Sequence, residues 1–232
     1  MQDHPTRFGL FAAMPLPDVD ATLKEIEYAY DTLKADGVGL LTSYDDIWLG
    51  HAAFRPVMAE LNRRHAVVHV HPTAANCCRN LDYGAAPGTI EYATDTTRAI
   101  IGVTFSGDAA RFSDIRFIWS HAGGSAPFLA GRIDGASASA KDRMPNGFIA
   151  EAKKFYYDTA GAANRGAIAS LLQLVTTSQI LFGTDFPPGG SSQEVARQLA
   201  QLGMFDQNAL REIERENAVR ILPRLRAAVM QG

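Results

Sequence analysis

Residues 66–73 read AVVHVHPT, an apolar run that ends on two histidines and a proline. A short apolar run closed by proline predicts a strand that is buried on both faces, as in a parallel sheet. Working outward, apolar residues follow helical spacing over 54–61 before this run and over about 90–105 after it. The stretch therefore predicts a strand between two helices, the unit from which parallel α/β folds are built.

The same alternation of strands and helices continues towards both ends of the chain. Strand-like apolar runs lie at 8–14, 38–42, 66–71, 116–121, 155–159 and 179–183. Helical patterns separate them, and two more close the chain at about 192–202 and 207–222. This alternation fits either an open doubly wound sheet or a (β/α) barrel. No glycine-rich phosphate-binding fingerprint follows the first run, which removes the main support for a dinucleotide-binding open sheet.

Composition narrows the class of protein. The chain has 232 residues, of which 47% are hydrophobic and 20% charged, so it can bury a sizeable core. The net charge of −3 argues against nucleic-acid binding, and no apolar run approaches the roughly 20 residues of a membrane span. Cys77 and Cys78 are neighbours that cannot staple a fold, and the N-terminus lacks the apolar segment of a secretion signal. We therefore expect free thiols, a cytoplasmic location, and no nucleic-acid or membrane partner.

Residue types that bind metals stand at the carboxyl ends of the predicted strands, where parallel α/β folds carry their chemistry. His69 and His71 are two apart on one strand and therefore point to the same side. Neutral imidazoles are good ligands for zinc or manganese. His71, at the strand tip, is the favoured ligand. His69 lies one layer deeper and is either a second ligand or a core histidine.

Three more strand ends carry polar residues. His121 in WSHAGG precedes Gly123 and Gly124, which would let a substrate or a backbone come close, although a lone histidine can also be a cap or a core residue. Asp185 in LFGTDFPP can bind a metal or act as a base, or it can cap the helix that follows. Asp158 in YYDTAG has a supporting or a catalytic role. Together these residues predict a mononuclear metal site built from different strand ends.

Five segments resemble the amidohydrolase superfamily, in particular its decarboxylase branch, which includes aminocarboxymuconate-semialdehyde, γ-resorcylate and 6-methylsalicylate decarboxylases. The segments are RFGLFAAMPLPD at 7–18, ADGVGLLTSY at 35–44, AVVHVHPT at 66–73, FIWSHAGGSAPFLAGRI at 117–133 and ILFGTDFPP at 180–188. The resemblance covers nearly the whole chain, and its last two motifs together are specific. It implies a TIM-like (β/α) barrel.

The resemblance also implies roles for individual residues. His71 and Asp185 correspond to metal ligands, and His121 to the histidine that works beside the metal as acid or base. Arg132 corresponds to an arginine that meets the substrate carboxylate, in some relatives across a subunit boundary. A guanidinium suits that task because it can donate two hydrogen bonds to one carboxylate. The alternative for Arg132 is a surface salt bridge.

The chain departs from the family pattern at its start. Members supply an H-x-H or E-x-H ligand pair from their first strand, whereas this sequence opens at what resembles their third strand, and His4 stands alone before a proline. We therefore expect one domain over residues 1–232, truncated at its N-terminus, with about six of the eight strands of a barrel. An incomplete barrel exposes strand edges, so a homodimer or a higher oligomer is expected.

The leading functional hypothesis is a metal-dependent, non-oxidative decarboxylase of an aromatic or unsaturated hydroxy-carboxylic acid. A divalent metal, zinc first and manganese second, would hold the carboxylate and a neighbouring oxygen. His121 or the carboxyl group of Asp185 would protonate the ring carbon, and Trp48 and Phe186 would help to line an aromatic pocket. Two alternatives remain open: a metal-dependent hydrolase of a lactone or an amide, and a catalytically inactive, truncated family member.

Overall fold

A computed structural model describes residues 8–78, 84–222 and 224–225 and contains a parallel sheet of six strands. Their order is β1-β2-β5-β6-β7-β8, so spatial neighbours also follow one another along the chain. They span Phe11–Ala13 (β1), Gly37–Leu41 (β2), Val67–His71 (β5), Arg116–Trp119 (β6), Tyr156–Asp158 (β7) and Ile180–Leu181 (β8). Each strand overlaps one predicted run, and the predicted α/β class is confirmed. His4 lies outside the described residues.

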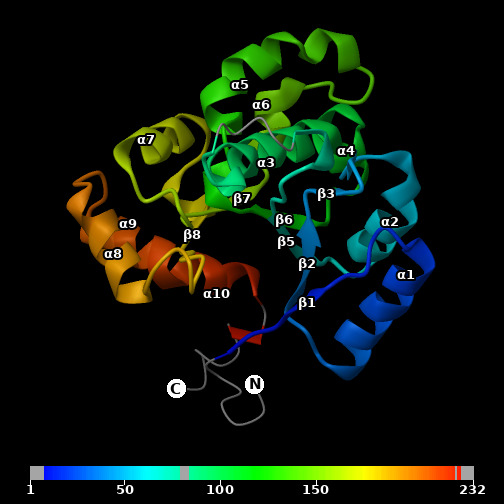
Figure 1. The fold of residues 1–232 in the computed structure, drawn as a ribbon, viewed down its shortest axis with the longest axis horizontal. Coiled ribbons are helices and arrows are strands. Elements are labelled where there is room, and N and C mark those ends of the chain that lie inside the picture. The colour runs from blue at the N-terminus through cyan, green and yellow to red at the C-terminus, as the bar shows by residue number, and fades with distance from the viewer. Residues whose placement is uncertain (1–7, 79–83, 223, 226–232) are drawn as a thin grey trace.

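The helices form an arc around the strands, from α1 and α2 through α3, α5 and α7 to α8 (Figure 1). Their bounds are Val19–Glu27 (α1), Arg55–Arg63 (α2), Pro87–Phe105 (α3), Asp108–Arg111 (α4), Ala126–Gly135 (α5), Gly147–Ala152 (α6), Arg165–Leu174 (α7), Ser192–Gln201 (α8), Gln207–Arg211 (α9) and Asn217–Ile221 (α10). A short hairpin of Ser43–Tyr44 (β3) and Ile47–Trp48 (β4) follows β2 and was not predicted from the sequence. Among the described residues, no helix has both the length and the apolar character needed to cross a membrane.

Alternate residues of each strand face opposite sides of the sheet, because the side-chain period of a strand is two. Val68 of β5 and Trp119 of β6 are fully buried in the large core beneath the surrounding helices. Their chain neighbours Val67 and Ile118 belong to a separate inner cluster that also contains Ile221 of α10. The sheet therefore has an outer face covered by helices and an inner face of its own, as the strands of a barrel do.

The end of the chain links the two edge strands of this sheet. α10 follows β8 and packs Ile221 against the inner cluster. The guanidinium of Arg224 donates from Nε and Nη2 to the carboxylate of Asp36 at 2.7 and 2.8 Å, and from Nη2 to the Phe8 carbonyl at 2.6 Å. Asp36 precedes β2 and Phe8 precedes β1. The C-terminal segment therefore reaches from the β8 side of the sheet to the β1 side.

Candidate metal centre

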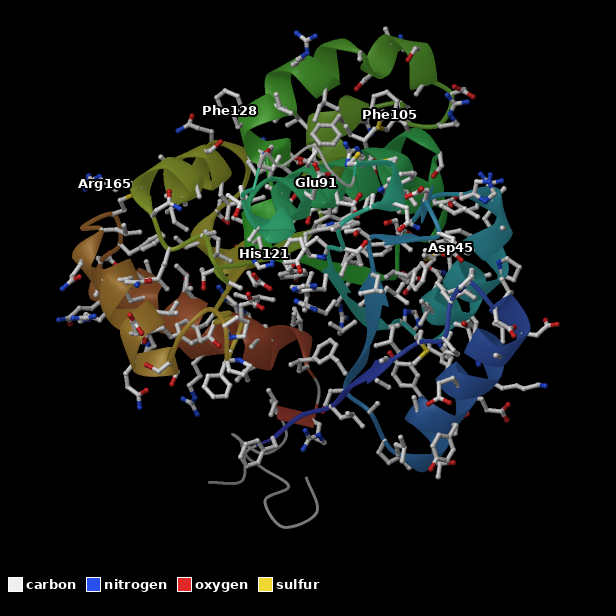
Figure 2. The ribbon with its side chains drawn as sticks, viewed as in Figure 1. Asp45, Glu91, Phe105, His121, Phe128 and Arg165 are labelled. Carbon is white, nitrogen blue, oxygen red and sulfur yellow. The ribbon has the colours of Figure 1, made fainter. Side chains whose placement is uncertain are left out.

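Three predicted site residues meet at the carboxyl end of the sheet. His71 is the last residue of β5, His121 follows β6 at the start of the short helix η4 (His121–Gly123), and Asp185 lies in the loop after β8. One ligand atom from each lies within 4.8 Å of the others, and His71 Nε2 is 3.8 Å from Asp185 Oδ1. In Figure 2, the label of His121 lies within the arc of helices. Residues 114 positions apart in the chain thus converge because parallel strands end at the same edge of the sheet.

Hydrogen bonds fix which nitrogen of each imidazole is available. His71 Nδ1 lies 2.9 Å from the Pro72 carbonyl oxygen, and His121 Nδ1 lies 2.9 Å from the Ala160 carbonyl oxygen. A carbonyl oxygen only accepts, so each Nδ1 carries the proton and each Nε2 keeps its lone pair. Within the described part of the chain, His121 Nε2 is buried and has no hydrogen-bond partner. A buried lone pair aimed at a second imidazole and a carboxylate fits a divalent cation.

The electrostatic environment of His71 favours its role as a neutral ligand. Burial, followed by the nearby His121 ring, lowers the pKa of His71 below its ordinary value of 6.5. Only the neutral imidazole binds a metal, so the lowered pKa keeps His71 competent as a ligand to a lower pH than an exposed histidine.

Asp158, the last residue of β7, makes hydrogen bonds to several residues of the site. Its Oδ1 accepts hydrogen bonds from the backbone N–H groups of His121 at 2.9 Å and Ala160 at 3.0 Å, and its Oδ2 lies 3.0 Å from His69 Nε2. The Ala160 carbonyl oxygen in turn accepts a hydrogen bond from Nδ1 of the His121 ring. Asp158 thus supports His121, and His69 pairs with this carboxylate instead of joining the group of three ligands.

The loops that carry His121 and Asp185 have unusual backbone conformations. His121, Ala122 and Asp185 have positive φ angles of 54°, 54° and 56°, a region that non-glycine residues seldom occupy. Such conformations persist only where the surroundings impose them, and they cluster at functional sites. Asp185 does not cap the helix that follows, because Ser191 is the N-cap of α8. The capping interpretation of Asp185 was therefore wrong.

Because Gly124 has no side chain, the backbone of α3 can approach the loop that carries His121. Gly124 lies at φ 63° and ψ −129°, and a Cβ placed on it would stand 2.2 Å from the carbonyl oxygen of Ala93 in α3. The Ser125 N–H also donates to that carbonyl and to Thr97 Oγ1. The glycine that was expected to admit a substrate or a backbone here admits the backbone of α3.

A cavity of about 370 Å³ opens beside the ligands, on the inner face of the sheet. His71 and Asp185 line it, as do His69, Ser120 and Asp158. The rest of its wall is largely apolar and includes Phe11, Ile118, Leu181, Phe182 and Ile221. Its size and lining match those of small-molecule pockets, with a few polar groups gathered at one side.

The other predicted substrate-binding residues do not line this cavity. The Trp48 indole N–H donates to Asp95 Oδ1 at 2.6 Å, in a separate buried cluster. Phe186, next to Asp185, is 74% exposed, and Arg132 is exposed on α5. One residue that was not predicted from the sequence does reach the site: Tyr92 of α3 contacts the rings of both His71 and His121. No motif marked it, because it lies in the middle of a helical pattern.

Comparison with known proteins assigns the whole chain to a family. A sequence profile described as amidohydrolase matches residues 1–224. The chain belongs to the amidohydrolase family. The resemblance inferred from the sequence motifs is therefore confirmed.

Relatives of this amidohydrolase-family chain carry decarboxylase names. It is 35% identical to decarboxylase yanB of Aspergillus niger over 96% of its own length and 65% of that protein. It is also 35% identical to 6-methylsalicylic acid decarboxylase of Penicillium expansum, over 96% of its length and 71% of that protein. The chain thus spans about two thirds of the length of these relatives.

A solved structure of the same fold is that of a dihydroxybenzoic acid decarboxylase from Polaromonas, with bound manganese and the inhibitor 2-nitroresorcinol. The TM-score is 0.84 at 20% identity, over 96% of this chain and 71% of that one. At this level of identity the comparison establishes a shared fold.

Proposed function

We propose that this single-domain chain is a metal-dependent, non-oxidative decarboxylase of aromatic hydroxy-carboxylic acids. The observation that carries the proposal is the meeting of two imidazoles and one carboxylate, of which His71 and Asp185 line a largely apolar cavity of about 370 Å³. Such a cavity suits one aromatic ring with small substituents. The names of the relatives agree with this chemistry.

The charge of the cavity supports metal dependence. Its described lining includes the carboxylates of Asp158 and Asp185 and contains no lysine or arginine. An anionic substrate would therefore meet like charges in a site of low dielectric. A divalent cation held by His71 and Asp185 would supply the missing positive charge.

The donor set also bears on the identity of the metal. Imidazole and carboxylate ligands favour zinc and also admit manganese, so we propose zinc first and manganese second. His71 and Asp185 would hold the cation, which would supply Lewis-acid chemistry to the bound substrate.

His121 is the proposed proton donor. As an imidazolium it would still donate from Nδ1 to Ala160. His121 does not itself line the cavity, but one of its ring nitrogens lies within 4.8 Å of ligand atoms of His71 and Asp185, which do. The proton passes from Nε2 to the ring carbon that bears the carboxylate. The bond between that carbon and the carboxyl carbon then breaks, carbon dioxide leaves, and the electron pair restores the aromatic ring. An ortho-hydroxyl group on the substrate stabilises the protonated ring.

Arg132 is proposed to act in a neighbouring subunit. It is exposed on α5, one helical turn after Phe128, which is 80% exposed and lies at the periphery in Figure 2. An exposed aromatic residue beside an exposed arginine suits an interface between protein chains. A homodimer would bring Arg132 to the partner's substrate carboxylate. The free thiols of Cys77 and Cys78 fit a reducing, cytoplasmic location.

The first prediction tests the reaction. The purified chain is reconstituted with Zn²⁺ or Mn²⁺ and supplied with 2-hydroxybenzoates and with aromatic lactones. We expect release of carbon dioxide from ortho-hydroxy acids, loss of this activity with a chelator, and recovery on adding metal back. Ring opening of lactones without carbon dioxide would instead identify a hydrolase. Metal content below about a tenth of an equivalent would favour an inactive protein.

The second prediction tests Arg132. Arg132→Ala and His121→Asn should each be inactive alone. Mixed dimers of the two variants would contain one intact site if Arg132 serves the partner's site, so an equilibrated mixture should recover about a quarter of the wild-type activity. A mixture without activity would mean that Arg132 does not act across the interface. Full activity of Arg132→Ala would mean that Arg132 is a surface residue with no role in catalysis.

A further inference from the structure

Tyr92 lies against both histidines of the metal centre. Its ring is stacked on that of His121, with centroids 6.1 Å apart and an angle of 27° between the planes. It meets His71 edge to face, at 5.7 Å and 74°. Both distances fall within the range of attractive aromatic pairs. The two imidazoles also contact each other at 5.3 Å, so the three rings form one group.

The backbone around Tyr92 is hydrogen-bonded to, and packs closely against, the segment that carries His121. Ser125 donates to Ala93, the next residue of α3, and the absence of a side chain on Gly124 lets the two backbones meet. The position of the Tyr92 ring relative to His121 is therefore set by backbone contacts.

The ring has little freedom on its other side. A Cβ on Gly88, one turn earlier in α3, would lie 3.1 Å from the Tyr92 ring. The ring thus lies between Gly88 and His121, and a side chain at position 88 would crowd it. No hydrogen bond joins the Tyr92 hydroxyl to another of the described residues, so the interaction with the histidines belongs to the ring.

Among the described residues, each imidazole makes one hydrogen bond, from Nδ1 to a carbonyl oxygen. One such bond leaves the imidazole able to pivot about it, and the direction of Nε2 changes when it does. A flat ring in contact with both imidazoles opposes this motion. We propose that Tyr92 is a positioning residue that pre-orients Nε2 of His71 for the cation and holds Nε2 of His121 beside it. The inference rests on the metal site of the proposed function.

The test measures metal affinity in the absence of substrate. Zn²⁺ binding is followed by competition with a chromophoric chelator, and Co²⁺ binding by its visible absorption spectrum, for the wild type, Tyr92→Leu and Tyr92→Phe. Groups that orient metal ligands typically contribute 10- to 100-fold to metal affinity. We expect Tyr92→Leu to weaken Zn²⁺ binding by about 10- to 100-fold and to alter the Co²⁺ spectrum. Tyr92→Phe, which keeps the ring, should restore both.

The controls separate this role from a general loss of stability. Tyr28 is 49% exposed and lies outside the group of three rings, so Tyr28→Leu should bind metal as the wild type does. If Tyr92→Leu proves insoluble, Tyr92→Met removes the ring in the same way. Equal affinity of the wild type and Tyr92→Leu, or failure of Tyr92→Phe to restore binding, would overturn this inference alone. Failure of the wild type to bind metal would overturn the proposed metal site and this inference with it.

Discussion

Replacing His121 by asparagine is expected to lower the rate of carbon dioxide release by about 10²- to 10⁴-fold, the usual contribution of a positioned general acid. The asparagine amide can still donate to the Ala160 carbonyl, as His121 Nδ1 does at 2.9 Å, but it has no atom in place of Nε2. The variant therefore removes the proposed proton donor while it keeps the local hydrogen bond. The measurement is kcat and kcat/KM on the best ortho-hydroxy acid, together with the metal content of the same sample.

The metal content distinguishes two roles for this histidine. Retained metal with lost activity would assign His121 to proton transfer. Loss of metal would make His121 a ligand, with the carboxyl group of Asp185 as the proton source. An unchanged rate would contradict both roles. His51→Asn is the matched control, because His51 is exposed and caps a short helix (η2, Ala52–Phe54) outside the cavity lining, and it should leave kcat unchanged.

Replacing Gly124 by alanine is expected to cause a large loss of stability. The added Cβ would stand 2.2 Å from the Ala93 carbonyl oxygen, and φ at Gly124 is +63°. Backbone strain of this kind costs about 1–3 kcal/mol, and overpacking typically adds a similar amount. The free energy of unfolding should therefore fall by about 2–6 kcal/mol, a large share of the roughly 5–15 kcal/mol of a typical domain.

Urea denaturation followed by circular dichroism measures this loss. Gly131→Ala is the matched control, because no heavy atom lies within 4 Å of a Cβ at this exposed position within α5. Alanine there should stabilise the protein by about 0.5–1 kcal/mol, since glycine is a poor residue inside a helix. If the two variants unfolded at the same urea concentration, this result would contradict the close packing of α3 against the loop that carries His121.

The sequence predicted all six strands of the sheet because each is a short apolar run bounded by turn residues. This is local information: burial on both faces requires such a run wherever the strand stands. The strand ends also indicated His71, His121 and Asp185, because parallel strands bring their carboxyl ends to one edge. The hairpin β3–β4 escaped prediction because each of its strands has only two residues, too few for a periodic pattern.

By itself, then, the sequence determined the α/β class and the six strands of the parallel sheet, and it indicated the three residues of the candidate metal centre, since these depend on composition and order along the chain. The tertiary structure alone decided which partner each polar group takes. It paired His69 with Asp158, directed the Trp48 indole to Asp95, and set Tyr92 against two histidines from other elements. The reason is physical: such contacts depend on how far each helix slides and rotates over the sheet, and packing of the whole core fixes those positions.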